Sequence, residues 1–352
     1  MKLLRTVVVT LSAVVLIALA PGSSMPGFGG GGGWLNSPPL DPSSLRGKVV
    51  LVDFWEYTCI NCLRTLPYLR EWYKRYRNDG FVIVGVHTPE FTFSGDRKHI
   101  VDATKRLGVT WPVEIDAHRN VWNRFGVNAW PTELLFDQHG KLIETLEGEG
   151  NYQHTESMIQ SLLRAANPKL SLPPLMPLLQ RDSYTKPGAV CYPKTPEILL
   201  EQQRVANTPP SSGAAHSDQF YSAPGTYKDG AVYLDGNWHA NKQAVVFNSG
   251  GGYFGVKYHA IQVAVVMTPH NGQATRVNVT QDGKPVPKAD AGKDLRYSRN
   301  GTSYINVDAS RSYDVLLNAK FGHHVLRLYP QGYGLAIYDV AFESCEVPAS
   351  TR

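Results

Sequence analysis

The stretch that decides the fold runs from Val49 to Pro67 and reads Val-Val-Leu-Val-Asp-Phe-Trp-Glu-Tyr-Thr-Cys-Ile-Asn-Cys-Leu-Arg-Thr-Leu-Pro. Its apolar, β-branched opening is typical of a strand that is buried on both faces. Apolar residues then recur at positions 63, 66, 69 and 72, a spacing that predicts a helix. Cys59 and Cys62 lie between the two patterns. The stretch therefore predicts a strand, a sharp turn and a helix whose first turn carries a pair of cysteines.

Two cysteines separated by two residues at the start of a helix suit thiol–disulfide exchange. Amide groups at a helix N-terminus stabilise an anion, so we expect Cys59 to form a thiolate more readily than a free cysteine. Cys62 is close enough to attack a mixed disulfide on Cys59 and to release the product. Zinc would need two further ligands in register, and Cys191 and Cys345 stand alone in the sequence. We interpret the pair as a redox-active Cys59–Cys62 disulfide that needs no metal and no separate cofactor, over the alternatives of a zinc half-site or a structural disulfide.

Residues around this pair are similar to the thioredoxin superfamily. Asp53 stands six residues before Cys59, where that family keeps a buried acid, and the resemblance implies a proton relay for Cys62. The alternative is a capping role. Trp130-Pro131-Thr132 matches the family's loop with a cis proline. The resemblance implies that Pro131 shapes this loop and that Trp130 and Thr132 form the docking site for an extended substrate. Thr58 replaces the usual tryptophan, which leaves the redox potential open.

Three further polar residues have a structural and a functional interpretation. Glu56 lies three residues before Cys59, where it either tunes the acidity of the thiol or is a solvated loop carboxylate, and we favour the second. His87 and Glu90 are interpreted as structural or surface residues rather than catalytic ones.

Residues 40–166 are expected to form an α/β thioredoxin-like redox domain. A second buried strand is predicted from Phe81 to His87, and a helix from Asp96 to Leu107. A β-hairpin is predicted after the proline loop, and a closing helix from Thr155 to Ala166. An inserted helix–strand piece between the two halves is typical of extracytoplasmic thiol reductases and peroxiredoxins.

Four separated motifs resemble the thioredoxin-like domain of DipZ proteins, which are related to the TlpA and DsbD proteins. They are Tyr57-Thr-Cys-Ile-Asn-Cys-Leu-Arg-Thr-Leu-Pro-Tyr68, His87-Thr-Pro-Glu-Phe91, Trp130-Pro131 and Gly148-Glu-Gly-Asn-Tyr152. DipZ proteins join a DsbD/CcdA-type membrane electron carrier to such a domain and to a terminal β-rich module that looks like a carbohydrate-binding fold. This sequence lacks a multi-span membrane domain. The resemblance implies a reductase of protein or small-molecule disulfides that receives electrons from a separate membrane donor.

The sequence before the redox domain suggests export. Residues 1–20 have a basic start, an apolar run and the small-x-small end Ala18-Leu19-Ala20 of a signal peptide, and an uncleaved membrane anchor is the alternative. Either way, we expect a periplasmic or otherwise extracytoplasmic location. Residues 21–39 are rich in glycine and proline and predict a flexible linker.

After the redox domain, residues 167–225 predict a linker and a segment that crosses between domains, with Ala206 to Gly225 as a loop. Residues 226–347 predict an all-β sandwich or jelly roll, because short apolar strands alternate with turn signals. Four of the predicted strands matter below: Ala244–Phe247, Ala260–Met267, Val315–Leu317 and His324–Tyr329.

Three features of the second domain bear on its chemistry. Cys191 and Cys345 bracket it, and in an oxidising compartment we expect them to form a structural disulfide. The adjacent residues His323 and His324 resemble a metal-binding pair. However, adjacent residues on a strand point to opposite faces, so we expect that they bind no metal ion. Four aromatic residues either stack on a glycan or belong to the core: Trp238, Tyr253, Tyr258 and Tyr333.

Composition narrows the class of protein. The chain has 352 residues and a formal charge of only +5, which is spread along the sequence and argues against nucleic-acid binding. A thiol peroxidase is a competing function, but Glu56 and Val52 occupy the positions where peroxiredoxins have threonine and proline. A glycan-binding module that localises a redox domain is the third hypothesis.

Overall fold

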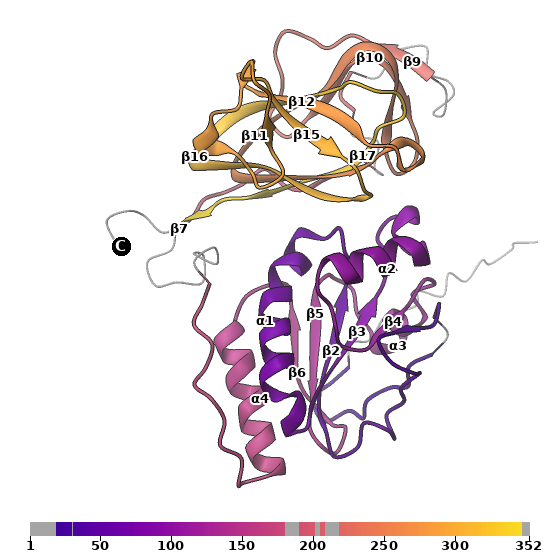
Figure 1. Cartoon of the computed structure of the whole chain (residues 1–352), viewed down its shortest axis with the longest axis vertical. Coiled ribbons are helices and arrows are strands. Elements are labelled where there is room, and N and C mark those ends of the chain that lie inside the picture. Colours follow the sequence, from indigo (N-terminus) through magenta and orange to yellow (C-terminus); the bar gives the residue numbers. More distant parts are fainter. Residues whose placement is uncertain (1–18, 30, 180–189, 201–204, 208–217, 347–352) are drawn as a thin grey trace, which may run out of the picture.

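The computed structural model describes residues 19–29, 31–179, 190–200, 205–207 and 218–346. Most of the expected signal peptide, residues 1–18, lies outside the described residues. Figure 1 shows an α/β domain below and an all-β domain above it, and the predicted fold class is thereby confirmed. Among the described residues, no helix combines the length and the apolar composition that a membrane crossing requires.

The α/β domain is built on a single six-stranded sheet in the order β1-β4-β3-β2-β5-β6. β2, β3 and β4 are parallel, whereas β1, β5 and β6 pair antiparallel to their neighbours. Every residue of β2 is buried, as its apolar sequence requires. The helices and strands are β1 Trp34–Leu35, β2 Val49–Trp55, α1 Ile60–Tyr76, η1 Arg77–Asp79, β3 Phe81–His87, η2 Thr92–Gly95, α2 Arg97–Arg106, β4 Val113–Ile115, α3 Asn120–Phe125, β5 Thr132–Phe136, β6 Leu142–Glu147 and α4 Tyr152–Ala166.

The described part of residues 21–39 belongs to this domain, so the prediction of a flexible linker is wrong. β1 pairs with β4, and Met25 is buried in the core. Gly31 shows why the glycines are needed, because a Cβ atom there would lie 2.1 Å from the carbonyl oxygen of Ile115. The glycine-rich sequence therefore provides close backbone packing and not slack.

Residues 167–179 contain no helix or strand, yet they are ordered against the redox domain. In Figure 1 this segment runs along α4. The backbone N–H of Met176 donates to Glu156 at 2.6 Å, and Gln160 donates to the carbonyl oxygen of Pro173 at 2.8 Å. Residues 167–179 are thus fixed along one side of the redox domain.

The second domain is all β, with one extended sheet whose main path is β14-β15-β12-β16-β11-β10-β9. One contiguous apolar core contains side chains from most of its strands. Its elements are β7 Val190–Cys191, β8 Ile198–Leu199, β9 Asp218–Tyr221, β10 Val232–Ala240, β11 Val245–Thr268, η5 His270–Gly272, β12 Thr275–Gln281, β13 Lys284–Pro285, η6 Lys288–Asp290, β14 Arg296–Tyr297, β15 Ser303–Val307, β16 Arg311–Pro330, β17 Ala336–Glu343 and β18 Cys345–Glu346.

The strand predictions for this domain need two corrections. The four short strands quoted above merge into two long ones, β11 and β16. In each long strand, the sequence between the two predicted short strands resembles a turn, but its backbone stays in the ladder. The register of the β10–β11 pair shifts next to Gly236 of β10, whose φ is +90°. The predicted loop Ala206 to Gly225 contains strand β9, and positions 208–217 lie outside the described residues.

Candidate active site

Cys59 and Cys62 lie at the junction of β2 and α1. Cys59 is the N-cap residue of α1, and its Sγ accepts a hydrogen bond from the backbone N–H of Cys62 at 3.2 Å. Both cysteines carry free thiols, with Cys59 half-buried and Cys62 fully buried. Cys59 is therefore the more exposed residue of the pair, and Cys62 lies deeper in the domain.

Burial dominates the acidity of the two thiols. It raises the pKa of Cys59, and the hydrogen bonds with Cys62 only partly offset this effect. The negative charges of Glu90 and Glu56 raise the Cys59 pKa further. Burial also raises the pKa of Cys62 well above its usual range, and its hydrogen bond to Cys59 adds to that effect. Loss of solvation thus opposes the stabilisation of a Cys59 thiolate by the helix N-terminus, and the ready formation of this thiolate stays a prediction.

Glu56 holds the loop that leads into Cys59. Its Oε2 atom accepts hydrogen bonds from the backbone N–H groups of Thr58 at 2.6 Å and of Cys59 at 3.1 Å, and from the Thr58 hydroxyl. Its Oε1 atom lies 3.7 Å from Nε2 of His87, which is buried and stacks on Tyr57. The interpretation of Glu56 as a solvated carboxylate is wrong, because the loop folds back over the side chain and buries it.

Asp53 is fully buried in β2, and neither of its carboxyl oxygens has a hydrogen-bond partner among the described residues. Burial raises its pKa well above the ordinary range, and the neighbouring charge of Glu133 adds to the shift. Glu133 is the residue opposite Asp53 on β5, and burial raises its pKa to about 7. Glu133 was not among the residues predicted from the sequence. The signal for it was a lone acid inside the otherwise apolar strand that follows the proline loop.

The buried pair Asp53 and Glu133 makes stability depend on pH. Because burial raises the Glu133 pKa to about 7, the folded state binds more protons than the unfolded state between the ordinary glutamate pKa and about 7. The free energy of unfolding therefore falls as pH rises through this window, by up to about 3 kcal/mol for Glu133. We expect Glu133→Gln to flatten this fall, measured by urea unfolding between pH 5 and pH 8. Glu147→Gln, at an exposed position on β6, is the control, and equal slopes in wild type and Glu133→Gln would contradict the prediction.

The proline loop has the geometry that the resemblance implied. The Trp130–Pro131 peptide bond is cis, and the Thr132 hydroxyl donates to the carbonyl oxygen of Ala129 at 2.8 Å. The indole ring of Trp130 packs on that of Trp122 with ring centroids 4.4 Å apart. The guanidinium of Arg119 lies 4.9 Å from the Trp130 ring. The loop is thus well supported, and the docking role of Trp130 and Thr132 stays a prediction.

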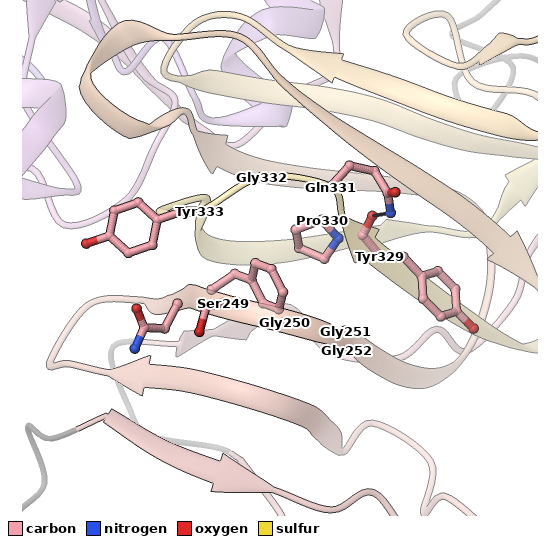
Figure 2. A pocket seen from close by; sticks show the side chains of 11 residues that line it. Ser249, Gly250, Gly251, Gly252, Tyr329, Pro330, Gln331, Gly332 and Tyr333 are labelled. Atoms are coloured by element: carbon pink, nitrogen blue, oxygen red, sulfur yellow. Dashed lines mark hydrogen bonds between the residues drawn. The ribbon is translucent and has the colours of Figure 1, made fainter.

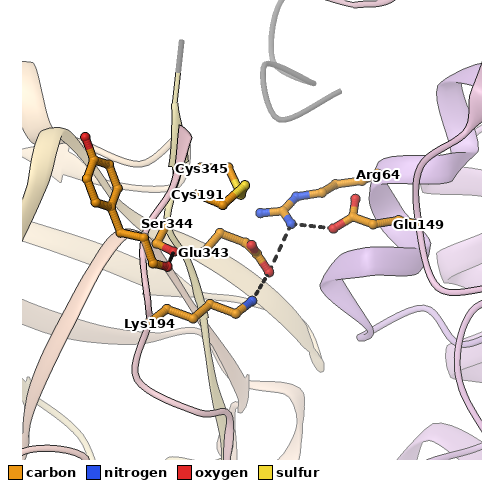
Figure 3. The surroundings of a disulfide bond; sticks show 8 residues. Arg64, Glu149, Cys191, Lys194, Glu343, Ser344 and Cys345 are labelled. Carbon is orange, nitrogen blue, oxygen red and sulfur yellow. Dashed lines mark hydrogen bonds and ion pairs between the residues drawn. A yellow bond between two sulfur atoms is a disulfide. The ribbon is translucent and has the colours of Figure 1, made fainter. Parts of the chain in front are cut away.

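The second domain covers the edge of the redox domain from which α1 starts (Figures 1 and 3). Arg64, two residues after Cys62, is central to this contact. Its Nη1 atom lies 2.7 Å from Glu149 and 3.5 Å from Glu343, and its Nη2 atom donates to Gln262 at 2.5 Å. Glu149 belongs to the redox domain, whereas Gln262 and Glu343 lie on β11 and β17. Arg64 had no predicted role, because its partners are distant in the chain.

An aromatic contact lies at the same interface. Tyr338 of β17 packs against Phe91 and Phe93, with ring centroids 5.3 Å and 4.6 Å apart. The backbone N–H of Thr92 donates to the side chain of Gln243 at 3.2 Å. The loop after β3 therefore contacts the all-β domain through both its side chains and its backbone.

Cys191 and Cys345 form a disulfide that joins β7 to β18, as the sequence suggested (Figure 3). The same segment leads to Lys194, which pairs with Glu343 and so with the ion-pair group around Arg64. The disulfide thus closes the all-β domain next to the interface.

Of the two interpretations of the four aromatic residues, a stacking platform or core positions, the described structure shows no platform formed by all four. Trp238 and Tyr258 are fully buried in the core, and Tyr253 is half-buried and bonds to the Tyr227 hydroxyl. Tyr333 alone is well exposed, at 59%. It lines a cavity of about 540 Å³ whose opposite wall is the strand segment 249–252 (Figure 2). Glycan binding therefore stays a prediction that rests on one exposed ring.

Comparisons with known proteins agree with this arrangement. The family described as Thioredoxin-like matches residues 47–142, and the family described as Thioredoxin like C-terminal domain matches residues 195–342. Protein DipZ of Mycobacterium bovis is 33% identical over 257 residues, which cover 72% of this chain and 36% of that protein. The thiol-disulfide oxidoreductase ResA of Bacillus thuringiensis is 27% identical over 128 residues, or 36% of this chain and 71% of that protein. The chain thus spans about a third of the length of the DipZ relative.

Proposed function

This chain is a thioredoxin-like protein of the DipZ type, and from that premise we propose that it is an extracytoplasmic thiol–disulfide oxidoreductase that reduces disulfides in proteins or small molecules. The observation that carries the proposal is the position of the dithiol. A half-buried Cys59 caps α1, and the fully buried Cys62 lies one helical turn along with its N–H directed at the Cys59 sulfur. This geometry supports attack by the outer sulfur and resolution by the inner one.

The reaction transfers two electrons in two exchanges. The Cys59 thiolate attacks one sulfur of the substrate disulfide, which forms a mixed disulfide and releases the other substrate sulfur as a thiolate. The Cys62 thiolate then attacks the Cys59 sulfur, which releases the second substrate thiolate and leaves the Cys59–Cys62 disulfide. The two thiol protons of the enzyme end on the two substrate thiols. The dithiol itself holds the electrons, so the reaction needs no other cofactor.

Asp53 is the proposed proton acceptor for Cys62. Both groups are buried, so neither the Cys62 thiolate nor the Asp53 carboxylate is well solvated. The pKa of each group is raised as a result. A carboxylate with a raised pKa is a stronger base than a solvated one, which favours transfer of the Cys62 proton to it. The carboxyl oxygens of Asp53 have no hydrogen-bond partner among the described residues, which supports this role over a capping role.

Each cycle must be completed by a dithiol donor that reduces the Cys59–Cys62 disulfide. We propose a membrane protein of the DsbD/CcdA type, because the resemblance to DipZ proteins implies such an electron carrier. The aligned region covers only 36% of the DipZ relative. The donor and the substrates meet the same edge of the redox domain, beside the all-β domain and Arg64.

The reduction potential of the Cys59–Cys62 pair tests the direction of electron flow. We expect a value near that of thioredoxin, roughly −270 mV, because burial raises the pKa of both thiols. The reduced form therefore gains no stability as a thiolate, which favours a reducing pair over an oxidising one. Equilibration with a reference dithiol, followed by alkylation and mass spectrometry, gives the value. A potential near roughly −120 mV would make the protein an oxidant and would contradict the proposal.

A further inference from the structure

Two histidines from neighbouring strands of the all-β domain face each other. His259 of β11 and His323 of β16 are direct cross-strand partners, with ring centroids 5.0 Å apart. Directly opposed residues of antiparallel strands have Cβ atoms about 4.5–5.5 Å apart and point to the same face. His259 is half-buried and His323 is exposed, so both rings are accessible from solvent.

A carboxylate completes this group. The Oδ2 atom of Asp229 lies 2.7 Å from Nδ1 of His259. One potential ligand atom from each of Asp229, His259 and His323 lies within 4.8 Å of the others. In a tetrahedral site with bonds of about 2.0–2.1 Å, ligand atoms lie about 3.3 Å apart. Since Asp229 and His323 are exposed, small side-chain rotations are enough to reach that spacing.

We propose that Asp229, His259 and His323 bind one divalent transition-metal ion of the zinc class. Two imidazoles and one carboxylate suit zinc, copper or nickel, whereas calcium and magnesium prefer oxygen ligands alone. Three protein ligands leave the fourth position of a tetrahedral ion to water or to a donor atom of a binding partner. The site is separate from the Cys59–Cys62 dithiol and does not depend on the proposed redox function.

The backbone beneath the site is fixed before any ion binds. The N–H of His259 donates to the Thr195 hydroxyl at 2.8 Å, and the N–H of Thr195 donates to the carbonyl oxygen of His259 at 3.0 Å. Next to Asp229, the N–H of Gly230 donates to the carbonyl oxygen of Lys257 in β11 at 2.8 Å. Only side chains would therefore have to move on binding, which lowers the cost of forming the site.

The absence of a metal was predicted from the adjacent residues His323 and His324 only. Those two do point differently, since His323 is exposed and His324 is half-buried, 2.8 Å from Asp282. The second histidine of the proposed site comes instead from β11, 64 positions earlier in the sequence, and only the strand register brings it opposite His323.

Calorimetric titration with zinc chloride tests the proposal. The full chain, without a histidine tag, is first oxidised so that the Cys59 and Cys62 thiols cannot bind zinc. We expect one zinc ion per chain for wild type. Mutation of a residue that only supports a metal ligand typically weakens metal binding by about tenfold or more. Removal of a ligand itself should weaken binding at least as much, so we expect His323→Ala to bind zinc at least about tenfold more weakly than wild type. His154→Gln is the matched control, because His154 also pairs with a carboxylate, Glu144 at 2.9 Å, but lies in the other domain.

His323 is exposed, so its replacement is not expected to disturb folding, and circular dichroism of each variant checks this point. Titration with cobalt chloride gives an independent readout, because a tetrahedral site produces a visible absorption band that His323→Ala should lose. Absence of saturable zinc binding by the wild type would overturn the proposal, as would equal zinc affinity of wild type and His323→Ala.

Discussion

Serine in place of Cys59 is expected to abolish disulfide reduction, whereas serine in place of Cys62 leaves the first attack intact and traps the substrate. Only Cys59 is accessible at the N-cap of α1, while Cys62 is fully buried. Without Cys62 the mixed disulfide on Cys59 has no internal sulfur to resolve it. Mixing each reduced variant with a disulfide-bonded peptide, followed by mass spectrometry, should show a covalent adduct for Cys62→Ser and none for Cys59→Ser.

The same experiment reports on the acidity of Cys59. Because burial raises its pKa, the adduct on Cys62→Ser should form faster as pH rises from neutral into the alkaline range. The double variant Cys59→Ser/Cys62→Ser keeps the Cys191–Cys345 disulfide and should show neither turnover nor adduct. An adduct on Cys62 in the Cys59→Ser protein would contradict the assignment of the two roles.

Removal of the Cys191–Cys345 disulfide is expected to destabilise the all-β domain by about 5 kcal/mol. The bond joins residues separated by 154 positions, and the entropy of closing a loop of this length accounts for that magnitude. The measurement is hydrogen exchange of the amides in β11 and β16, which reports the stability of this domain by itself. In the Cys191→Ser/Cys345→Ser variant, their protection should fall by roughly three to four orders of magnitude.

The redox domain provides the internal control for this variant. Amides of β2 and β3 belong to a separate core, so their protection should change much less than that of β11 and β16. Unchanged protection of β11 and β16 would show that the disulfide adds little to the stability of the all-β domain. An equal loss in both domains would instead show that they unfold as one cooperative unit.

Local sequence was sufficient for the centre of the redox domain. The apolar run of β2, the helical spacing after Cys62 and the two-residue gap between the cysteines depend only on residues that are close in the chain. Such patterns follow from backbone geometry, which repeats every two residues in a strand and every 3.6 in a helix. Asp53 was identified differently, because its place six residues before Cys59 matches the buried acid of the thioredoxin superfamily.

The burial of Glu56 and Glu133 was not visible in the sequence. Glu56 looked like a solvated carboxylate, and its enclosure by the loop through Thr58 and Cys59 appears only in the structure. Glu133 became part of the site because β5 pairs with β2 in one register. The acidity of Cys59 depends on the tertiary structure for the same reason: the helix N-terminus is a local feature, whereas desolvation depends on everything that packs around the thiol.

The sequence alone determined the dithiol and the strand and helix that carry it. It also determined the change from an α/β to an all-β domain and the candidate disulfide partners. Only the tertiary structure decided that residues 21–39 pack on the redox domain, that Arg64 meets Gln262 across the domain interface, and that His259 faces His323. The physical reason is the range of the interactions. Propensity and periodicity act within a few residues, whereas register, burial and ion pairing join residues that are distant in the chain.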